Sequence, residues 1–395
     1  IHECTTSFRG FHVSLFNSVN VSAIQSNGYS FFFEYVYKVK QIGAEMTEIP
    51  IHFKDRFKGQ SKIPKTEILR STYKLLGIFF SRFIKTKYNL LKPVDFDYTC
   101  YFCNSQCMIE MFSEVREDES FGVQAYECTS KEHQTKPQVL NCLVCGLSFV
   151  PKSKYPDDIE SLYSNVEDPT YLKYMDARYK TFSKALNKIS PYIPKSGEIL
   201  DVGAYCGLFL KTIQSSRNSW NATGVEPSKW AAEYGRNHLD LDIKNGTLEE
   251  NIPRLNNYDL IVSWDVLEHV TDPLAFLKQI SSIMKDNGVF CFSTLDIDNW
   301  FPKLMGKKWP WLMDMHLFYF NKNTVEQFLY EAGLKAISVK RYVHYASIQY
   351  LFEKMYSILP YSFVRPLSIF KKVIPNNISI PFSFGDIKLF ICQKV

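Results

Sequence analysis

Apolar positions in the carboxyl-terminal half of the chain follow two alternating periods. Short apolar runs, typical of buried strands, are separated by longer stretches with the 3.6-residue period of amphipathic helices. This alternation predicts an α/β fold with an open, mostly parallel, doubly wound sheet that helices cover on both faces. A last antiparallel strand pair is expected around residues 335–340 and 387–393. The other strands are expected at residues 198–203, 222–226, 259–263 and 289–294, and the helices at residues 171–189, 208–216, 229–238 and 273–285.

The amino-terminal part lacks this alternation and divides into three segments. Residues 1–64 look like part of a domain, residues 65–92 form a basic amphipathic helix or linker, and residues 93–150 hold most of the cysteines. A helix with apolar and basic faces at 65–92 is suited to a membrane surface, and a linker helix packed on its neighbours is the alternative. Residues 151–395 form the α/β domain.

Composition is that of an ordinary globular protein, with 46% hydrophobic and 22% charged residues among 395. The longest apolar runs fall far short of the roughly 20 residues that span a bilayer. The net charge of +5 is local, because residues 1–99 hold 14 basic and 8 acidic residues whereas residues 100–395 hold 32 and 33. This distribution is unlike that of a nucleic-acid-binding protein, so no nucleic-acid partner is expected. Without an initial Met or a signal-peptide pattern, the chain is expected to be a cytoplasmic fragment of a longer protein, in peripheral contact with the cytoplasmic membrane face through residues 65–92.

Six of the ten cysteines lie between residues 100 and 145, and four of these form two C-x-x-C pairs. This clustering favours a reduced compartment and a structural zinc site. The 38 residues between the pairs exceed the usual spacing and predict an inserted hairpin over residues 110–135. Cys107 and Cys128 could be alternative ligands, and free thiols or a redox pair are competing interpretations. The predicted ligands, which fill a tetrahedral Zn²⁺ site, are Cys100, Cys103, Cys142 and Cys145.

A glycine-containing turn follows the first predicted strand of the α/β domain. Gly203 allows a sharp turn, and Gly207 opens the next helix, whose N–H groups point at a ligand. Glu226 ends the second strand, 23 residues after Gly203, where a carboxylate accepts hydrogen bonds from ribose hydroxyls. The G-x-x-x-G spacing lacks the pyrophosphate-binding turn of dinucleotide sites, which favours S-adenosylmethionine. The alternatives are a bare strand–helix turn for the glycines, and a helix-capping or surface acid for Glu226.

Six motifs make residues 198–340 similar to class I S-adenosylmethionine-dependent methyltransferases. They read D-V-G-A-Y-C-G, G-V-E-P, G-T-L-E-E, W-D-V-L-E-H-V-T-D-P, D-N-G and H-L-F-Y-F. The subgroup resembled includes ubiquinone-pathway O-methyltransferases and sugar-tailoring enzymes, and the resemblance implies a seven-stranded sheet. Tyr205 departs from the family, which often has a second glycine there. The resemblance implies that the methionine part of the cofactor is contacted by Asp201, Gly203, Ala204, Tyr205 and Gly207. It implies that Glu226 binds the ribose and that Gly246, Thr247 and Leu248 lie near the adenine. Trp264 and Asp265 would border the cofactor. Sugar-type members also carry a zinc segment with an ending like residues 142–149.

Two histidines follow strands at the carboxyl end of the predicted sheet, where ligands bind in this architecture. His269 and His316 are therefore candidates for the general base that removes a proton from an acceptor hydroxyl. Alternatively, His269 braces the next helix and His316 lies in a packing loop. Residues 300–315 combine four aromatic residues with three lysines, and this composition predicts a lid over the acceptor or aromatic core filling.

Residues 3–62 resemble the carboxyl-terminal part of a family-2 glycosyltransferase of the dolichol-phosphate mannose synthase type. The motifs are T-T-S-F-R-G-F, S-N-G-Y-S-F, E-I-P-I-H-F and R-x-x-G-Q-S-K. Glu3 and Ser7, at the first motif, depart from the Asp and Gly that are usual in the family. Arg56, Ser61 and Lys62 match a loop that lies near phosphates in that family. Sixty residues cannot form the complete sheet, so no glycosyl transfer is expected.

The sequence thus predicts an S-adenosylmethionine-dependent methyltransferase with a small-molecule or glycan acceptor. A sugar or glycan intermediate, lipid-linked or free, is the leading candidate. A quinone-like aromatic acceptor is the alternative within the enzyme class. A non-catalytic zinc- and membrane-binding module is the alternative outside it. The sequence gives no indication of the oligomeric state.

Overall fold

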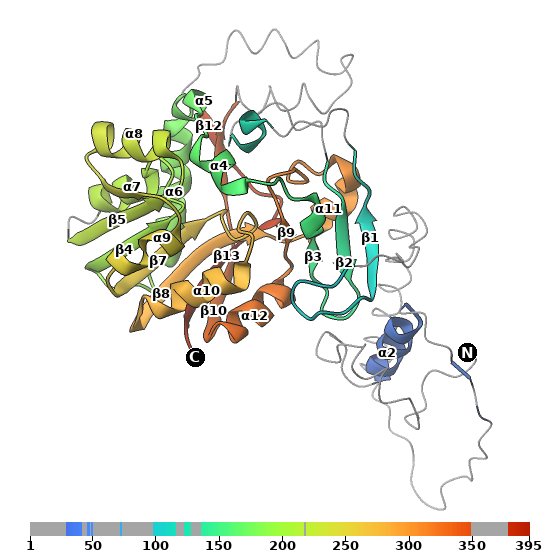
Figure 1. Cartoon of the computed structure of the whole chain (residues 1–395). Helices are drawn as coiled ribbons and strands as arrows, with labels where there is room; N and C mark the ends of the chain where they lie inside the picture. The colour runs from blue at the N-terminus through green and yellow to red at the C-terminus, as the bar shows by residue number, and fades with distance from the viewer. Residues whose placement is uncertain are drawn as a thin grey trace, which may run out of the picture. The chain divides into compact units, whose positions relative to one another are not determined.

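The computed structural model describes residues 29–41, 46–47, 49, 72, 98–115, 122–127, 136–216, 219–348 and 378–395 (Figure 1). The chain divides into a smaller unit, residues 1–113 with 139–148, and a larger unit, residues 114–138 with 149–395. Most of the glycosyltransferase-like motifs lie outside the described residues. Of the basic segment 65–92, only Thr72 is described. Within the described ranges, every helix is too short or too polar to cross a membrane.

The larger unit is built on a seven-stranded sheet in the order β10-β13-β8-β7-β4-β5-β6. Strand β13 runs antiparallel to both of its neighbours, and β8, β7, β4, β5 and β6 are parallel. The predicted α/β class, the mostly parallel sheet and the carboxyl-terminal strand pair are therefore confirmed. The strands are β4 (Gly197–Val202), β5 (Trp220–Glu226), β6 (Asp242–Asn245), β7 (Tyr258–Trp264), β8 (Met284–Leu295), β10 (Leu334–Arg341) and β13 (Ile387–Lys394).

Helices lie on both faces of this sheet (Figure 1). One group contains α6 (Met175–Ile189), α7 (Leu208–Ser216) and α8 (Lys229–Leu239), and the other contains α9 (Leu248–Asn251), α10 (Pro273–Ser282) and α12 (Lys322–Glu331). Polar side chains fix where several of them begin. Ser228, Asp272 and Asn321 each accept a hydrogen bond from a backbone N–H in the first turn of α8, α10 and α12.

The structure corrects the bounds of two predicted helices and of the strand expected at residues 289–294. The helix expected at 171–189 is two helices, α5 (Pro169–Leu172) and α6, because Asp168 caps α5 and the backbone of Tyr174 leaves the helical region. Helix α10 ends at Ser282 and not at residue 285, because β8 already begins at Met284 and pairs there with β7. The polar stretch after Met284 hid this early start of the strand.

The remaining elements of the larger unit are short and lie around the sheet. Strands β11 (His344–Ser347) and β12 (Ser379–Phe382) pair with each other as a separate antiparallel sheet. The other short elements are η2 (Val123–Tyr126), η3 (Lys152–Lys154), α4 (Ile159–Ser164), η4 (Ile252–Arg254), α11 (Trp300–Met305), η5 (Gly306–Lys308) and β9 (Phe318–Tyr319).

The smaller unit contains helix α2 (Tyr29–Gln41) and two antiparallel strands, β1 (Met108–Phe112) and β2 (Val139–Cys142). Strand β3 (Ser148–Phe149) lies at the point where the chain passes from this unit to the larger one. The hairpin expected over 110–135 is wider than predicted, because β1 begins before that range and its partner β2 lies entirely after it.

Substituting Gly207 by alanine is expected to destabilise the larger unit by about 2–5 kcal/mol. Gly207 has φ +78°, and a Cβ there would lie 2.4 Å from Cδ1 of Leu241. The cost combines a left-handed backbone with an overpacked core. Gly333 is a matched control, since its φ is +72° but its added Cβ would meet only Ser281 Oγ at 3.9 Å. Denaturant titration of both variants separates the two causes, and equal losses would contradict the packing role of Gly207.

Candidate active site

A cavity of about 500 Å³ lies at the carboxyl ends of β4, β5 and β7. Its wall includes the segments that follow these three strands, together with parts of α4, α6, β11 and β12. Gly207 and Gly246 are not part of the wall. The predicted site residues that do line it are Asp201, Gly203, Ala204, Tyr205, Glu226, Thr247, Leu248, Trp264, Asp265, His269 and His316.

The turn after β4 is left-handed at Gly203 and Tyr205 as well as at Gly207. Gly203 has φ +74°, and a Cβ there would lie 2.5 Å from Cγ2 of Val266. Tyr205 has φ +50°, so the residue that departs from the family pattern keeps the backbone conformation that favours glycine. Its ring packs 4.4 Å from the ring of Tyr171, which offsets part of the cost of that conformation.

Two buried carboxyl groups face the cavity from β4 and β5. Glu226 is 7% exposed, and its two oxygens accept hydrogen bonds from the backbone N–H groups of Tyr205 (2.7 Å) and Ser228 (2.8 Å). Burial raises the pKa of Glu226 to about 7 despite these bonds. Asp201 is 1% exposed, and burial followed by the charge of Glu226 holds its pKa well above the usual value. Asp201 Oδ1 is buried without a hydrogen-bond partner among the described residues, so it is an acceptor available to a ligand.

The wall beyond β6 is made by Thr247 and Leu248. The side chain of Thr247 caps α9 in a capping box with Glu250, which fixes the start of this short helix. Gly246 has φ +117°, and a Cβ there would lie 2.6 Å from Glu250 Oε2. Gly246 and Gly207 therefore shape the backbone behind the cavity rather than its surface.

His269 presents one ring nitrogen that is fixed by hydrogen bonding. Its Nδ1 lies 3.0 Å from the carbonyl oxygen of Met315 and 2.9 Å from the hydroxyl of Tyr163. A carbonyl only accepts, so Nδ1 carries the proton and Nε2 keeps its lone pair. Burial lowers the pKa of His269 to about 4, so the ring is neutral at pH 7. A neutral imidazole with a free lone pair can accept a proton.

His316 and Glu268 lie beside His269. The rings of the two histidines are 4.6 Å apart, and His316 Nδ1 is 2.7 Å from the carbonyl oxygen of Trp311. Burial and the nearby Asp265 raise the pKa of Glu268 to about 8, and its carboxyl accepts a hydrogen bond from Thr294. One ligand atom from each of Glu268, His269 and His316 lies within 4.8 Å of the others, so this group is also a potential set of metal ligands.

A second cluster of ligand atoms lies in the smaller unit, formed by the four cysteines of the C-x-x-C pairs. Cys100 Sγ is 3.5 Å from Cys145 Sγ, Cys103 Sγ is 3.5 Å from Cys142 Sγ, and all four lie within 4.8 Å of one another. In a tetrahedral Zn–S₄ centre with bonds of about 2.3 Å, sulfur atoms are about 3.8 Å apart. The spacing fits such an ion. Cys107 is not part of this group, and Cys128 lies outside the described residues.

The backbone around the four sulfur atoms has the form of two tight turns. Asn104 (φ 56°) and Gly146 (φ 81°) follow the pairs, and their N–H groups donate to the carbonyl oxygens of Cys100 (3.0 Å) and Cys142 (2.9 Å). Hydrogen bonding to Cys100 lowers the pKa of Cys103 and raises the pKa of Cys142. Ionisation of one thiol is therefore favoured at the expense of its neighbours, and a divalent cation would allow all four to ionise.

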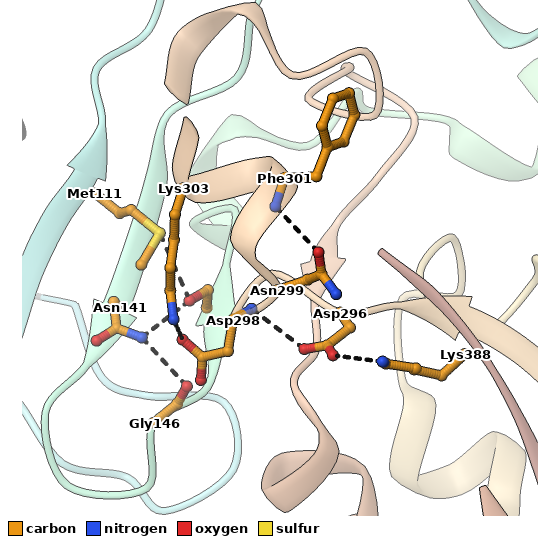
Figure 2. A network of polar contacts seen from close by, with 10 residues as sticks. Met111, Asn141, Gly146, Asp296, Asp298, Asn299, Phe301, Lys303 and Lys388 are labelled. Carbon is orange, nitrogen blue, oxygen red and sulfur yellow. Dashed lines mark hydrogen bonds and ion pairs between the residues drawn. The ribbon is translucent and has the colours of Figure 1, made fainter. Parts of the chain in front are cut away.

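Asn141 braces the second turn. Its side-chain amide donates to the carbonyl oxygen of Gly146 (3.2 Å) and to Ser148 Oγ (2.9 Å), as Figure 2 shows. The turn is thus held by bonds that do not involve sulfur.

Most of the cavity wall belongs to a segment that is similar to known proteins. A family model described as a methyltransferase domain matches residues 171–339. The chain contains a class I S-adenosylmethionine-dependent methyltransferase domain. That range includes β4 to β8 and the predicted cofactor and histidine residues.

Curated relatives of the methyltransferase domain are named ubiquinone biosynthesis O-methyltransferase. The protein of a Bradyrhizobium species is 33% identical over 144 residues, which are 34% of this chain and 53% of the relative. That of Bradyrhizobium diazoefficiens is 36% identical over 107 residues, which are 26% of this chain and 41% of the relative. The chain thus spans about half the length of the curated relatives it matches, or less. A solved methyltransferase of Thermotoga maritima, described as a possible histamine N-methyltransferase, is 18% identical, with a TM-score of 0.37 over 56% of this chain and 91% of that one. None of these matches supports the glycosyltransferase resemblance of residues 3–62, which stays a prediction.

Three further side chains of the larger unit line the cavity, and the sequence did not single them out. Arg178 of α6 lies with its guanidinium 3.7 Å from the centre of the Tyr171 ring. Tyr163 of α4 holds His269 as described. His344 of β11 has its Nε2 buried without a partner among the described residues, and burial lowers its pKa. Arg178 could have been predicted as a site residue, because it is a charged residue next to the buried face of α6 that Ala177 and Thr181 form. The sequence around Tyr163 and His344 has no comparable pattern.

The lid predicted over residues 300–315 is only partly present. Trp311 lines the cavity, whereas Trp309 is fully buried and its ring N–H donates to Asp386 (3.0 Å). Trp300 is 58% exposed on α11, and neither it nor Phe301 belongs to the wall. Of the four aromatic residues of the predicted lid, only Trp311 lines the cavity. The segment first passes over the surface and then turns into the core.

Proposed function

We propose that this chain transfers a methyl group from S-adenosylmethionine to a hydroxyl group of a small, ring-bearing acceptor. The observation that carries the proposal is one cavity that joins two buried carboxyl groups with the neutral imidazole of His269. The domain family and the names of the relatives support O-methylation. The chain spans about half of those relatives or less, so the activity and acceptor of the whole protein are part of the proposal.

The first part of the cavity fits the cofactor. The unpartnered Asp201 Oδ1 would accept from the ammonium group, and the Arg178 guanidinium would pair with the carboxylate of the methionine part. Glu226 has further lone pairs beyond its two backbone bonds and would accept from the ribose hydroxyls. When bound, S-adenosylmethionine supplies an electrophilic methyl group on a positively charged sulfur.

The second part of the cavity fits the acceptor. Tyr163, Trp311, His344 and Phe382 bring aromatic faces to its wall, against which a phenol or a sugar ring would stack. His269 Nε2 would take the hydroxyl proton as the oxygen attacks, while Met315 and Tyr163 hold the ring through Nδ1. His316 is only 4% exposed, so we assign it to packing against His269 rather than to proton transfer.

A phenolic acceptor is favoured over a sugar, because the relatives are O-methyltransferases of ubiquinone biosynthesis and the glycosyltransferase resemblance lacks support. This reverses the order expected from the sequence. The aromatic wall is compatible with both, so sugars form the second set of acceptors to test.

We assign a structural Zn²⁺ ion to the cysteine cluster. Four sulfur ligands leave no open position for substrate, so the ion would stabilise the smaller unit without taking part in methyl transfer.

The direct test combines calorimetry with a product assay. S-adenosylmethionine should bind with micromolar affinity while NAD does not, and a catechol or phenol should be converted to its methyl ether as detected by mass shift. Cofactor binding without turnover of phenols or sugars would remove the acceptor proposal. Absence of cofactor binding would remove the enzymatic proposal and favour the non-catalytic module.

Substituting Glu226 by glutamine should weaken S-adenosylmethionine binding by about 10–100-fold, the value of hydrogen bonds to a charged group. The wild-type affinity should also rise between about pH 6 and pH 8, because the ribose hydroxyls bind the ionised carboxylate and its pKa is about 7 in the free protein. The variant should lose this pH dependence. Titration calorimetry across that range measures both effects, and Glu249→Gln, on the same wall, is the control. An unchanged affinity in the Glu226 variant would remove the ribose assignment.

A further inference from the structure

Three large apolar side chains of the larger unit are exposed together outside the cavity. Trp300 is 58% and Leu304 72% exposed on α11, and Phe384 is 44% exposed in the turn between β12 and β13. The ring of Phe384 stacks on Phe301 with centroids 4.0 Å apart and lies 6.5 Å from the ring of Trp300. We call Trp300, Phe301, Leu304 and Phe384 the α11 patch. Apolar clusters of this kind on a surface usually mark an interaction site.

The α11 patch is held in place by polar bonds beneath it (Figure 2). Asn299 caps α11 through the N–H of Phe301 (3.0 Å), and its amide donates to the carbonyl oxygen of Gly385 (2.8 Å). One side chain thus joins the helix to the turn that carries Phe384. Asp296 accepts from the N–H of Asp298 (3.2 Å) and pairs with Lys388 (3.6 Å). The exposed rings therefore stand on a fixed base.

The charge around the α11 patch is mainly positive. Residues 300–308 contain three lysines and no acidic residue. Lys307 and Lys308 are exposed on η5, directly after α11. Lys303 pairs with the exposed Asp298 at 3.3 Å. The guanidinium of Arg341 lies beside the turn at Gly385.

We propose that the α11 patch docks this protein on an anionic lipid surface. Tryptophan and phenylalanine rings partition into the interfacial region of a bilayer, and lysines beside them are attracted to anionic headgroups. A protein partner would bury the apolar residues equally well, but a rim of lysines selects for a uniformly negative surface. This inference does not depend on methyl transfer, and it uses a surface different from the basic segment 65–92.

The position of the patch relative to the cavity supports this occupant. Phe384 lies 6.4 Å from the ring of Phe382, and Phe382 lies 5.7 Å from His344; these last two line the cavity. A row of aromatic rings therefore runs from the docking surface to the acceptor wall. A membrane bound at the α11 patch would lie next to that wall.

The test is sedimentation of the full chain with vesicles of phosphatidylcholine alone or mixed with phosphatidylglycerol. The protein should bind the mixed vesicles and release them at high salt. The affinity of the double variant Trp300→Ser/Leu304→Ser for the mixed vesicles should be lower by a factor of about ten or more. Lys307→Glu/Lys308→Glu should lose about 25-fold or more on mixed vesicles and little on neutral ones. Tyr330→Ser, which removes an equally exposed apolar side chain of α12, is the control and should bind as the wild type does.

Three outcomes would overturn the proposal. The first is vesicle binding that survives the Trp300/Leu304 change, which would assign the membrane contact elsewhere, such as to residues 65–92. The second is no vesicle binding at all by the wild type. The third is a concentration-dependent dimer, seen by analytical ultracentrifugation, that the same variant abolishes, because a second copy would then cover the patch. Circular dichroism of each variant reports folding without relying on cofactor binding, so the result stays separate from the proposed function.

Discussion

His269→Gln should lower kcat of methyl transfer about 100–10,000-fold while S-adenosylmethionine binds as in the wild type. The expected size is that of a positioned general base. Glutamine keeps a similar shape but cannot take up a proton at neutral pH. The assay is single-turnover methyl transfer with the acceptor found by screening, together with cofactor calorimetry.

The pH profile gives a second readout for His269. Because burial lowers its pKa to about 4, the imidazole stays neutral as the pH falls through its usual pKa near 6.5. Protonation of His269 should therefore lower kcat only as the pH falls to about 4. The matched control is His238→Gln, an exposed histidine on α8, which should leave kcat unchanged. A kcat for His269→Gln within threefold of the wild type would move the proton-acceptor role to another group.

Cys145→Ser should abolish stoichiometric zinc and unfold the cysteine-containing part of the smaller unit. Structural zinc in small domains supplies apparent binding energies of about 10–16 kcal/mol, so losing one thiolate removes a large share of local stability. Elemental analysis gives the metal content, and limited proteolysis followed by mass spectrometry reports the local unfolding.

Cys107→Ser is the control for the zinc assignment. Cys107 lies in the same segment but outside the four-sulfur group, so this variant should keep one zinc per chain. Wild-type protein that carries no metal, or that forms a disulfide between two of the four cysteines under air, would favour the redox interpretation. Equal zinc loss in both variants would point to a different ligand set.

The sheet could be predicted because its central strands contain short, buried apolar runs, such as residues 260–262 of β7. Strand β7 is buried at six of its seven residues, and periodicity detects such a run directly. Strand β6 was missed because Asp242–Asn245 has a single buried residue, Ile243, at the edge of the sheet. Its position comes from pairing with β5, which no local pattern encodes.

One side of the candidate site could also be predicted from the sequence, and the other could not. The cofactor side follows two strands in order, so Asp201 and Glu226 could be placed from their positions in the sequence. The acceptor side is assembled from distant segments, with Tyr163 before β4, the first strand of the sheet in the sequence, and His344 between β10 and β13. Trp309 and Trp311 are two residues apart, but one is core and the other is cavity wall, because the chain turns between them. Composition alone could not separate them.

The two hydrogen bonds that Glu226 accepts from backbone N–H groups connect the cavity to the segments around it. The same carboxylate ties the segment after β4, at Tyr205, to the segment after β5, at Ser228, and Ser228 in turn caps α8. A ligand that stabilises the ionised carboxylate strengthens both bonds, since charged acceptors bind N–H groups more strongly than neutral ones. Under the proposed assignment, occupancy of the ribose position would make two loops and the start of one helix more rigid. The bound and free states would then differ in local motion more than in shape.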